Sequence, residues 1–183
     1  MNRTARVILT FECRRRCDYC CNKYKRIIGG AQPISRPTDI GEYDEVCLTG
    51  GEPMLIMPAS VICWAKWLKR IGVSNVYVYM SAYSNLAALT ELLNYVDGIH
   101  YTLHEKSTLE DLWRFHEFQL IVARRYTGKS FRLFIHPNFP SPVTIEPKAW
   151  TRVEEKPWDG PNTCQLPANE DLFYWRDMCK KPA

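Results

Sequence analysis

The stretch ARVILTFECRRRCDYC, residues 5–20, decides the fold, because a largely apolar run leads there directly into three cysteines. A short run of this kind, bounded by polar residues, is typical of a buried β-strand. Cys13, Cys17 and Cys20 follow as soon as the run ends. We therefore expect a strand over residues 5–11 that ends in a loop carrying three thiols.

Strand-like runs alternate with segments of helical spacing over the next hundred residues. Further strands are expected at residues 42–51, 74–83, 97–105 and 130–137, and helices at 57–71, 86–96 and 107–126. In the last helix, Ser107 is expected as the N-cap, with Glu110 completing a capping box. Strands separated by helices pair in parallel with right-handed crossovers, so the pattern predicts an α/β fold.

The character of the chain changes after Pro137, where seven of the twelve prolines lie. A sixth strand is expected within VTIEPKAW, residues 143–150, and an irregular tail over about the last 25 residues. We expect one domain, with a core over residues 1–140 and with residues 141–183 supplying the last strand and a tail that packs on it.

Composition favours a globular protein in a reducing compartment. Apolar residues make up 46% of the 183 residues, and no apolar run approaches the roughly 20 residues that a membrane span needs. The N-terminus has no signal-peptide core, so the cytoplasm is the expected location. Eight cysteines suggest a disulfide scaffold as an alternative, but four of them crowd into positions 13 to 21, which favours a metal.

The net charge of +4 is unevenly distributed. Residues 1–36 contain nine Lys or Arg and two acids, which leaves about +7 there and about −3 in the remainder. Such a region attracts nucleic acid, an anionic substrate or an acidic protein, although a solvated basic surface has the same composition.

The three cysteines have the spacing CxxxCxxC. Three thiolates bind three irons of a cubane cluster and leave the fourth iron open to another ligand. Taken alone, the spacing also fits a zinc site or a redox-active pair at Cys17 and Cys20. Arg14, Arg15 and Arg16 lie between the first two cysteines, where they are candidates to pair with a carboxylate, to dock an acidic protein or simply to be solvated.

Together with Tyr19, just before the last cysteine, this segment resembles the first strand and cluster loop of the radical SAM superfamily. The resemblance implies a [4Fe–4S] cluster on Cys13, Cys17 and Cys20 that cleaves S-adenosyl-L-methionine (SAM) to a 5′-deoxyadenosyl radical, which abstracts hydrogen from a substrate. It implies a flavodoxin- or ferredoxin-type electron donor. It also implies a partial (β/α)6 TIM-like barrel of parallel strands, here with an irregular C-terminal tail.

A second motif, Gly50-Gly51-Glu52-Pro53, follows the second expected strand and resembles the GGEP motif of the same family. The glycines allow the backbone to approach a ligand closely, and Pro53 suits the first position of a helix. By resemblance, Glu52 accepts hydrogen bonds from the methionyl amino group of SAM. An isolated motif of this kind also fits an ordinary strand-to-helix turn.

Later strand ends supply the remaining expected contacts to the cofactor. The candidates are Ser81, Thr102, His104 and His136. The Ser81-Ala82-Tyr83 segment departs from the Thr-Asn-Gly that often ends the third strand in the family, and both histidines are equally suited to structural roles.

The substrate stays open between three hypotheses. The first is a nucleotide or nucleic-acid base, as in the deazaguanine synthase branch of the family, and the second is a glycine of a partner protein, as in the activating enzymes. The third, from another class, is a non-enzymatic metal- or nucleic-acid-binding module. In the tail, Cys164 and Cys179 raise the question of a second cluster, and Trp158, Asp159 and Trp175 that of a substrate lid.

Overall fold

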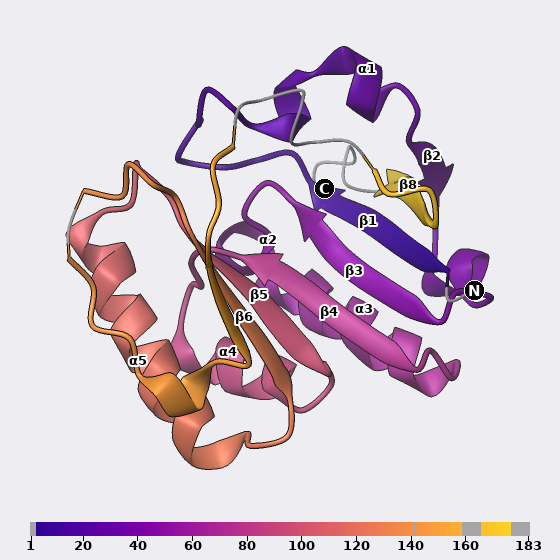
Figure 1. The fold of residues 1–183 in the computed structure, drawn as a ribbon. Helices are drawn as coiled ribbons and strands as arrows, with labels where there is room; N and C mark the ends of the chain where they lie inside the picture. The colour runs from indigo at the N-terminus through magenta and orange to yellow at the C-terminus, as the bar shows by residue number, and fades with distance from the viewer. Residues whose placement is uncertain (1–2, 141, 159–165, 177–183) are drawn as a thin grey trace.

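A single sheet of eight strands, all parallel, forms the centre of the computed structural model (Figure 1). The structure describes residues 3–140, 142–158 and 166–176. The strands are β1 (Thr4–Thr10), β2 (Gln32–Ile34), β3 (Glu45–Gly50), β4 (Asn75–Met80), β5 (Gly98–Leu103), β6 (Ser130–Ile135), β7 (Arg152–Glu155) and β8 (Glu170–Trp175). Their order across the sheet is β2-β8-β1-β3-β4-β5-β6-β7. The predicted α/β class with parallel strands is confirmed.

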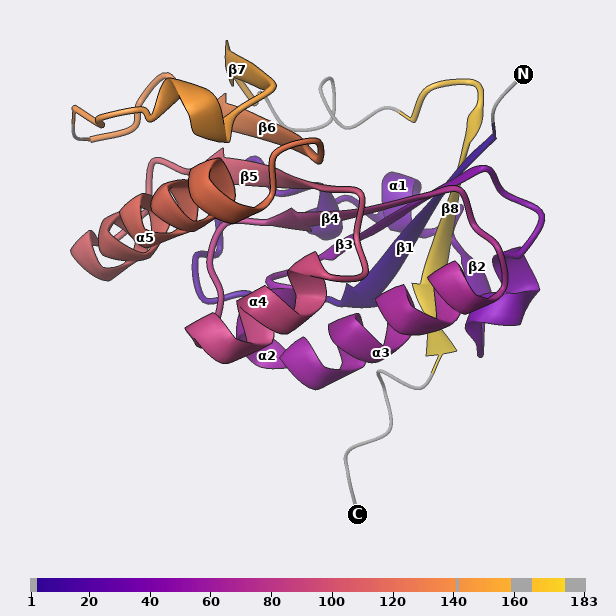
Figure 2. The ribbon, with the colours of Figure 1, turned by 90° about the horizontal axis from the view of Figure 1, so that it is seen from below.

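The helices that connect these strands gather on one side of the sheet (Figure 2). They are α2 (Pro53–Ile56), α3 (Pro58–Arg70), α4 (Leu86–Leu93) and α5 (Leu109–Arg125). The shorter α1 (Lys25–Ile28) follows the cysteine loop, and 3-10 turns span Cys21–Lys23, Pro37–Ile40 and Pro147–Ala149. Among the described residues, no helix has the length and apolar character to cross a membrane.

The hydrophobic core lies between the sheet and these helices. Alternate residues of each central strand, such as Val7, Leu48 and Val78, are fully buried in it together with Leu68 of α3 and Phe118 of α5. The period of two along the strands explains why these positions are apolar. The residues between them face the other side of the sheet, which we call the second face.

The second face is unusually polar for a buried surface. It presents Arg6, Ile8, Tyr77, Tyr79, His100, Thr102, Arg132 and Phe134, which alternate with core positions on β1, β4, β5 and β6. His100 and Thr102 are nevertheless buried. A sheet face that buries polar side chains is a natural wall for a ligand site.

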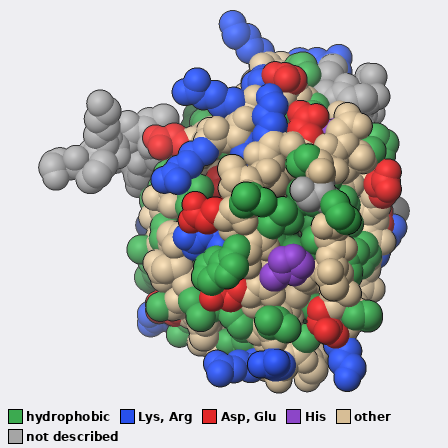
Figure 3. Space-filling view, turned by 90° about the vertical axis from the view of Figure 1, so that its left-hand side faces the viewer, with side chains coloured by type: hydrophobic (Ala, Val, Ile, Leu, Met, Phe, Trp, Pro, Cys, Tyr) green, Lys and Arg blue, Asp and Glu red, His purple; other side chains and the backbone are tan. Residues whose placement is uncertain are grey.

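The outward side of α5 is exposed and partly apolar. Leu109, Trp113 and Leu120 are all exposed there. Figure 3 looks onto this side of the molecule and shows hydrophobic side chains scattered among charged ones.

The start of α5 differs from the expected one. Its N-cap is Thr108 and not Ser107, and Asp111, not Glu110, completes the capping box. The Thr108 hydroxyl accepts a hydrogen bond from the Asp111 amide at 3.2 Å, and the Asp111 carboxylate accepts one from the Thr108 amide at 2.9 Å. Ser107 is engaged elsewhere, because its hydroxyl accepts a hydrogen bond from the His104 amide at 3.1 Å.

The expected sixth strand at residues 143–150 is also wrong. That segment contains the 3-10 turn Pro147–Ala149, and β7 begins only at Arg152. Pro147 cannot donate a backbone hydrogen bond to a sheet ladder, which favours a turn over a strand there. Val143 and Ile145 instead pack against the core, which explains their apolar character.

The expectation of an irregular tail fails where the tail is described. Residues 170–175 form β8, which lies in the sheet between β1 and β2. Phe173 of β8 is 6% exposed and packs edge-on against Tyr43, with ring centroids 5.6 Å apart. Residues 170–175 are therefore part of the sheet itself.

We predict that Phe173→Ala lowers the free energy of unfolding by about 3 kcal/mol, because it removes a buried ring from the sheet. Urea denaturation measures this loss. The matched control is Leu109→Ala, at a side chain that is 83% exposed, with an expected change within about 0.5 kcal/mol. Equal effects of the two substitutions would contradict the burial of β8.

Candidate functional site

A cavity of about 540 Å³ opens at the carboxyl ends of the strands, where parallel α/β sheets usually carry their sites. It also extends over the second face as far as Arg6 and Tyr79. Of the candidate site residues, those that line it are Cys13, Cys17, Tyr19, Cys20, Gly50, Gly51, Glu52, Ser81, Thr102 and His104. Pro53 and His136 do not line it. Pro53 is the buried first residue of α2, as its sequence context predicted.

The two glycines of the second motif hold the cysteine loop against β3. The Gly51 amide donates to the Thr10 carbonyl at 2.6 Å, and the Glu52 amide donates to the Glu12 carbonyl at 2.8 Å. A Cβ atom at Gly51 would lie 1.9 Å from the Glu12 carbonyl oxygen, and Gly50 has a positive φ of 125°. The close approach that the sequence predicted is therefore an approach to the chain's own backbone.

The three thiols of the loop share the cavity. Cys13, Cys17 and Cys20 are all free, and Cys17 is buried. Burial raises the pKa of the Cys17 thiol, and the nearby Tyr19 hydroxyl opposes this while the charges of Cys13 and Cys20 add to it. The loop therefore brings the three thiols to one cavity. Within residues 3–140, 142–158 and 166–176, however, no three His, Cys, Asp or Glu side chains are already arranged to hold a metal ion.

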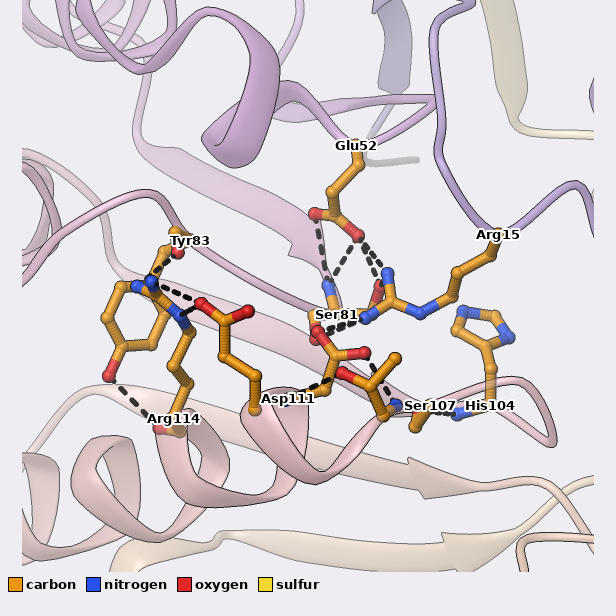
Figure 4. Close-up of polar contacts among 10 residues, drawn as sticks. Arg15, Glu52, Ser81, Tyr83, His104, Ser107, Asp111 and Arg114 are labelled. Atoms are coloured by element: carbon orange, nitrogen blue, oxygen red, sulfur yellow. Dashed lines mark hydrogen bonds and ion pairs between the residues drawn. The ribbon is translucent and has the colours of Figure 1, made fainter.

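Arg15 is the buried centre of the site (Figure 4). Its side chain is 6% exposed and ion-pairs with Glu52 at 3.0 Å and with Asp111 of α5 at 2.8 Å. It also donates to the Ser81 hydroxyl at 2.6 Å and to the Ser81 carbonyl at 3.3 Å. Arg15 therefore joins the cysteine loop to the ends of β3 and β4 and to the first turn of α5.

Glu52 is the only acidic side chain among the described residues that line the cavity. Its carboxylate also accepts hydrogen bonds from the Ser81 amide, at 3.2 and 3.1 Å to its two oxygens, and from the Ser81 hydroxyl. Burial raises the pKa of Glu52, whereas Arg15 and the Ser81 donors lower it. The carboxylate is buried and held by several donors, which is how proteins stabilise a buried charge.

A second arginine fastens the next part of the wall (Figure 4). Arg114 of α5 donates to the carbonyls of Tyr83 and Ser84 at 2.7 and 2.9 Å, and the Tyr83 hydroxyl donates to Glu117 at 2.6 Å. The segment after β4, which contains Ser81, is thereby fixed to α5. The Ser81-Ala82-Tyr83 segment, where the sequence departs from Thr-Asn-Gly, is therefore held by hydrogen bonds to Arg15, Glu52 and Arg114.

Tyr19 lies in a cluster of flat rings. Its hydroxyl is 2.9 Å from Nδ1 of His104, and its ring stacks on His136 with centroids 4.8 Å apart. Trp158 stacks on His136 at 5.8 Å and on Tyr19 at 6.1 Å, and it lines the cavity. Burial lowers the pKa of His104 to about 3, with a further contribution from Arg15, so His104 is neutral. His136 belongs to the site through these rings.

Sequence reasoning missed the residues of the second face that extend the cavity. Arg6, Tyr79, Phe134 and Lys156 line it, and His100 lies between the Tyr79 and Phe134 rings, at centroid distances of 4.4 and 5.9 Å. The signal was the alternation of these polar residues with core positions on the strands. Burial lowers the pKa of His100 to about 3, and the charges of Arg132, Arg6 and Lys156 act in the same direction.

Of the tail candidates, Trp158 lines the cavity and Trp175 does not. Trp175 lines a separate groove with Trp64 and Trp67. Asp159, Cys164 and Cys179 lie outside the described residues, so the lid and second-cluster hypotheses stay predictions there.

The chain matches no known family model, no curated protein and no solved structure.

We predict that Arg15→Met lowers the free energy of unfolding by about 3 kcal/mol, because it leaves the buried Glu52 without its counter-charge. The double variant with Glu52→Gln should recover part of this loss. Chemical denaturation measures both. Arg14→Met, at an exposed neighbour in the same loop, is the control and should change stability by no more than about 0.5 kcal/mol. An Arg15 variant as stable as the Arg14 variant would refute the structural role of the pair.

We also predict that burial of His100 makes the fold sensitive to acid. In the unfolded chain His100 takes up a proton near pH 6.5, whereas in the folded chain it does so only at about pH 3, so falling pH favours unfolding between these values. His100→Phe should remove about 2 kcal/mol of the stability difference between pH 6.5 and pH 4.5, measured by urea denaturation. Leu109→Ala, at an exposed position of α5 that does not titrate, should retain the wild-type pH dependence. Identical pH dependence in all three proteins would contradict this assignment.

Proposed function

We propose that this protein is a radical SAM enzyme, with a [4Fe–4S] cluster held by Cys13, Cys17 and Cys20. The observation that carries the proposal is that these three free thiols line one cavity together with Glu52 and Ser81. The two sequence motifs, with 29 residues between them, meet at one site through Arg15. Zinc-binding or simple redox roles of the cysteines do not account for the second motif.

The donor set fits the cluster chemically. Iron–sulfur clusters are held by thiolates, and three of them leave one iron open. Burial raises the pKa values of the Cys17 and Cys20 thiols, and binding of metal would displace the protons that these thiols carry. When bound, such a cluster supplies one electron that splits a carbon–sulfur bond of SAM and generates a 5′-deoxyadenosyl radical.

The charges around Arg15 suit the amino-acid part of SAM. A bound ammonium group finds its counter-charge at Glu52, the acidic residue of the cavity wall. Arg15 also has a buried Nε atom without a hydrogen-bond partner, to which a carboxylate oxygen would be a suitable acceptor. Glu52 and Arg15 together therefore match an amino group and a carboxylate held side by side.

The rings and hydroxyls of the later strand ends suit the nucleoside part. Tyr19, His104 and Trp158 offer flat surfaces at the cavity, and Ser81 and Thr102 offer hydroxyl groups. His136 supports them from behind by stacking on Tyr19 and Trp158. We assign ribose and adenine recognition to this group.

We interpret β1 and β3 to β7 as six strands of a partial (β/α)6 TIM-like barrel. In the sheet these strands lie side by side in the order β1-β3-β4-β5-β6-β7, and all are parallel. This arrangement is compatible with an arc of such a barrel. The strands β8 and β2 extend the arc beyond β1.

The surface around the cysteine loop suits an acidic electron donor of the flavodoxin or ferredoxin type. Exposed basic residues there are Arg14, Arg16, Lys23, Lys25 and Arg26. Lys and Arg side chains are prominent at the upper end of the molecule in Figure 3, the end at which the loop and α1 lie in Figure 1. Such donors work in the cytoplasm, which is where we expect the protein to act.

The test is anaerobic reconstitution with iron and sulfide. We predict about four iron and about four sulfide per chain, the stoichiometry of one cubane cluster. With SAM and a reductant, we predict formation of 5′-deoxyadenosine, measured by chromatography. Cys17→Ala should abolish both cluster and product.

The matched control is Cys63→Ala, which removes an exposed, free cysteine of α3 away from the cavity and should retain full activity. Binding of zinc in place of iron, or a cluster that yields no 5′-deoxyadenosine, would refute the enzymatic proposal. The non-enzymatic hypothesis predicts that second result.

A further inference from the structure

The cavity wall carries more positive than negative side chains. Its basic members are Arg6, Arg15, Arg16, Lys23 and Lys156, against the single carboxylate of Glu52 among the described residues. The charge of Arg15 is compensated by Glu52 and Asp111. The excess of positive charge therefore lies elsewhere in the cavity.

One concentration of this charge lies on the second face, away from Glu52. Lys156 follows β7, and its Nζ lies 5.6 Å from the centre of the Phe134 ring. Neither Lys156 nor Arg132 has an ion-pair partner within the described part of the chain. Arg6 is different, because Glu170 of β8 binds both its Nε and its Nη2.

His100 provides a second, independent sign of a missing partner. It is 5% exposed, and its Nδ1 atom is buried without any hydrogen bond. A buried polar atom left unpaired costs free energy, and such atoms often mark a site for a bound molecule or ordered water. The two rings that enclose His100, Tyr79 and Phe134, both line the cavity.

We propose that the part of the cavity lined by Arg6, Lys156, Tyr79 and Phe134, called here the cationic end, binds the oxyanion group of a small-molecule substrate. His100 and Arg132 are paired on neighbouring strands of the same face, and His100 packs against the Tyr79 and Phe134 rings. The group is a carboxylate or a phosphate, which share the charge and the acceptor oxygens that these residues require. Lys156 forms the direct ion pair, and His100 contributes its unpaired Nδ1 as a neutral hydrogen-bonding group beside the aromatic wall. Arg132 contributes positive potential, whereas the charge of Arg6 is balanced by Glu170.

The inference rests on the proposed function only in calling the ligand a substrate. It favours a nucleotide or another small anionic molecule over a glycine of a partner protein, because a backbone glycine carries no anionic group to pair with Lys156. The inference also places the substrate away from the Glu52 end of the cavity, where SAM is expected.

The experiment is isothermal titration calorimetry of the full chain, without added iron, with inorganic phosphate in one arm and benzoate in the other. We expect saturable binding of at least one anion at constant ionic strength, and the stronger arm identifies the preferred group. Lys156→Gln should weaken that binding about tenfold, and His100→Phe a few-fold, as expected for the loss of a charged and of a neutral hydrogen-bond donor.

The matched control is Lys148→Gln, which removes the same charge from an exposed lysine outside the cavity and should change affinity less than twofold. Absence of saturable binding in both arms, or equal affinity of the Lys156→Gln variant and the wild-type protein, would overturn the proposal. Because iron is not needed, failure of cluster reconstitution would leave this result standing, and the two proposals fail separately.

Discussion

The buried ion pair between Arg15 and Glu52 is the interaction on which the rest of the site depends. Arg15 comes from the cysteine loop, and its guanidinium also contacts Ser81 after β4 and Asp111 of α5. A planar group with five donors can satisfy several segments at once, which a lysine cannot. Since a buried charge must be compensated, each partner fixes the others, and the loop that carries the thiols is held over the strand ends.

The part of this arrangement that sequence could predict is the part with local signals. The strands from β1 to β6 other than β2 follow from short apolar runs, and the helices from their spacing. The thiols, Glu52 and Ser81 could be placed together because the carboxyl ends of parallel strands meet at one edge. Gly50 and Gly51 were predicted to let the backbone approach a ligand, whereas in the structure they lie close to the Thr10 and Glu12 carbonyls of the chain itself.

The part that sequence could not predict depends on contacts between distant segments. Three arginines stand in a row in the loop, and nothing local distinguishes Arg15, which is buried by residues as far away as Asp111. The insertion of β8 beside β1 joins segments more than 160 residues apart in sequence. Thr108 rather than Ser107 is the N-cap because the Ser107 hydroxyl already accepts a hydrogen bond from the His104 amide.

The distribution of charge gives the cavity two unlike ends, and this bears on how two ligands would share it. Near Glu52, the two carboxylates of Glu52 and Asp111 exceed the single charge of Arg15. At the cationic end, Glu170 cancels Arg6, and the charges of Arg132 and Lys156 remain. A ligand with an ammonium group is therefore favoured at the first end and repelled from the second, and an oxyanion has the opposite preference. The same charges that attract each ligand also keep it from occupying the place of the other.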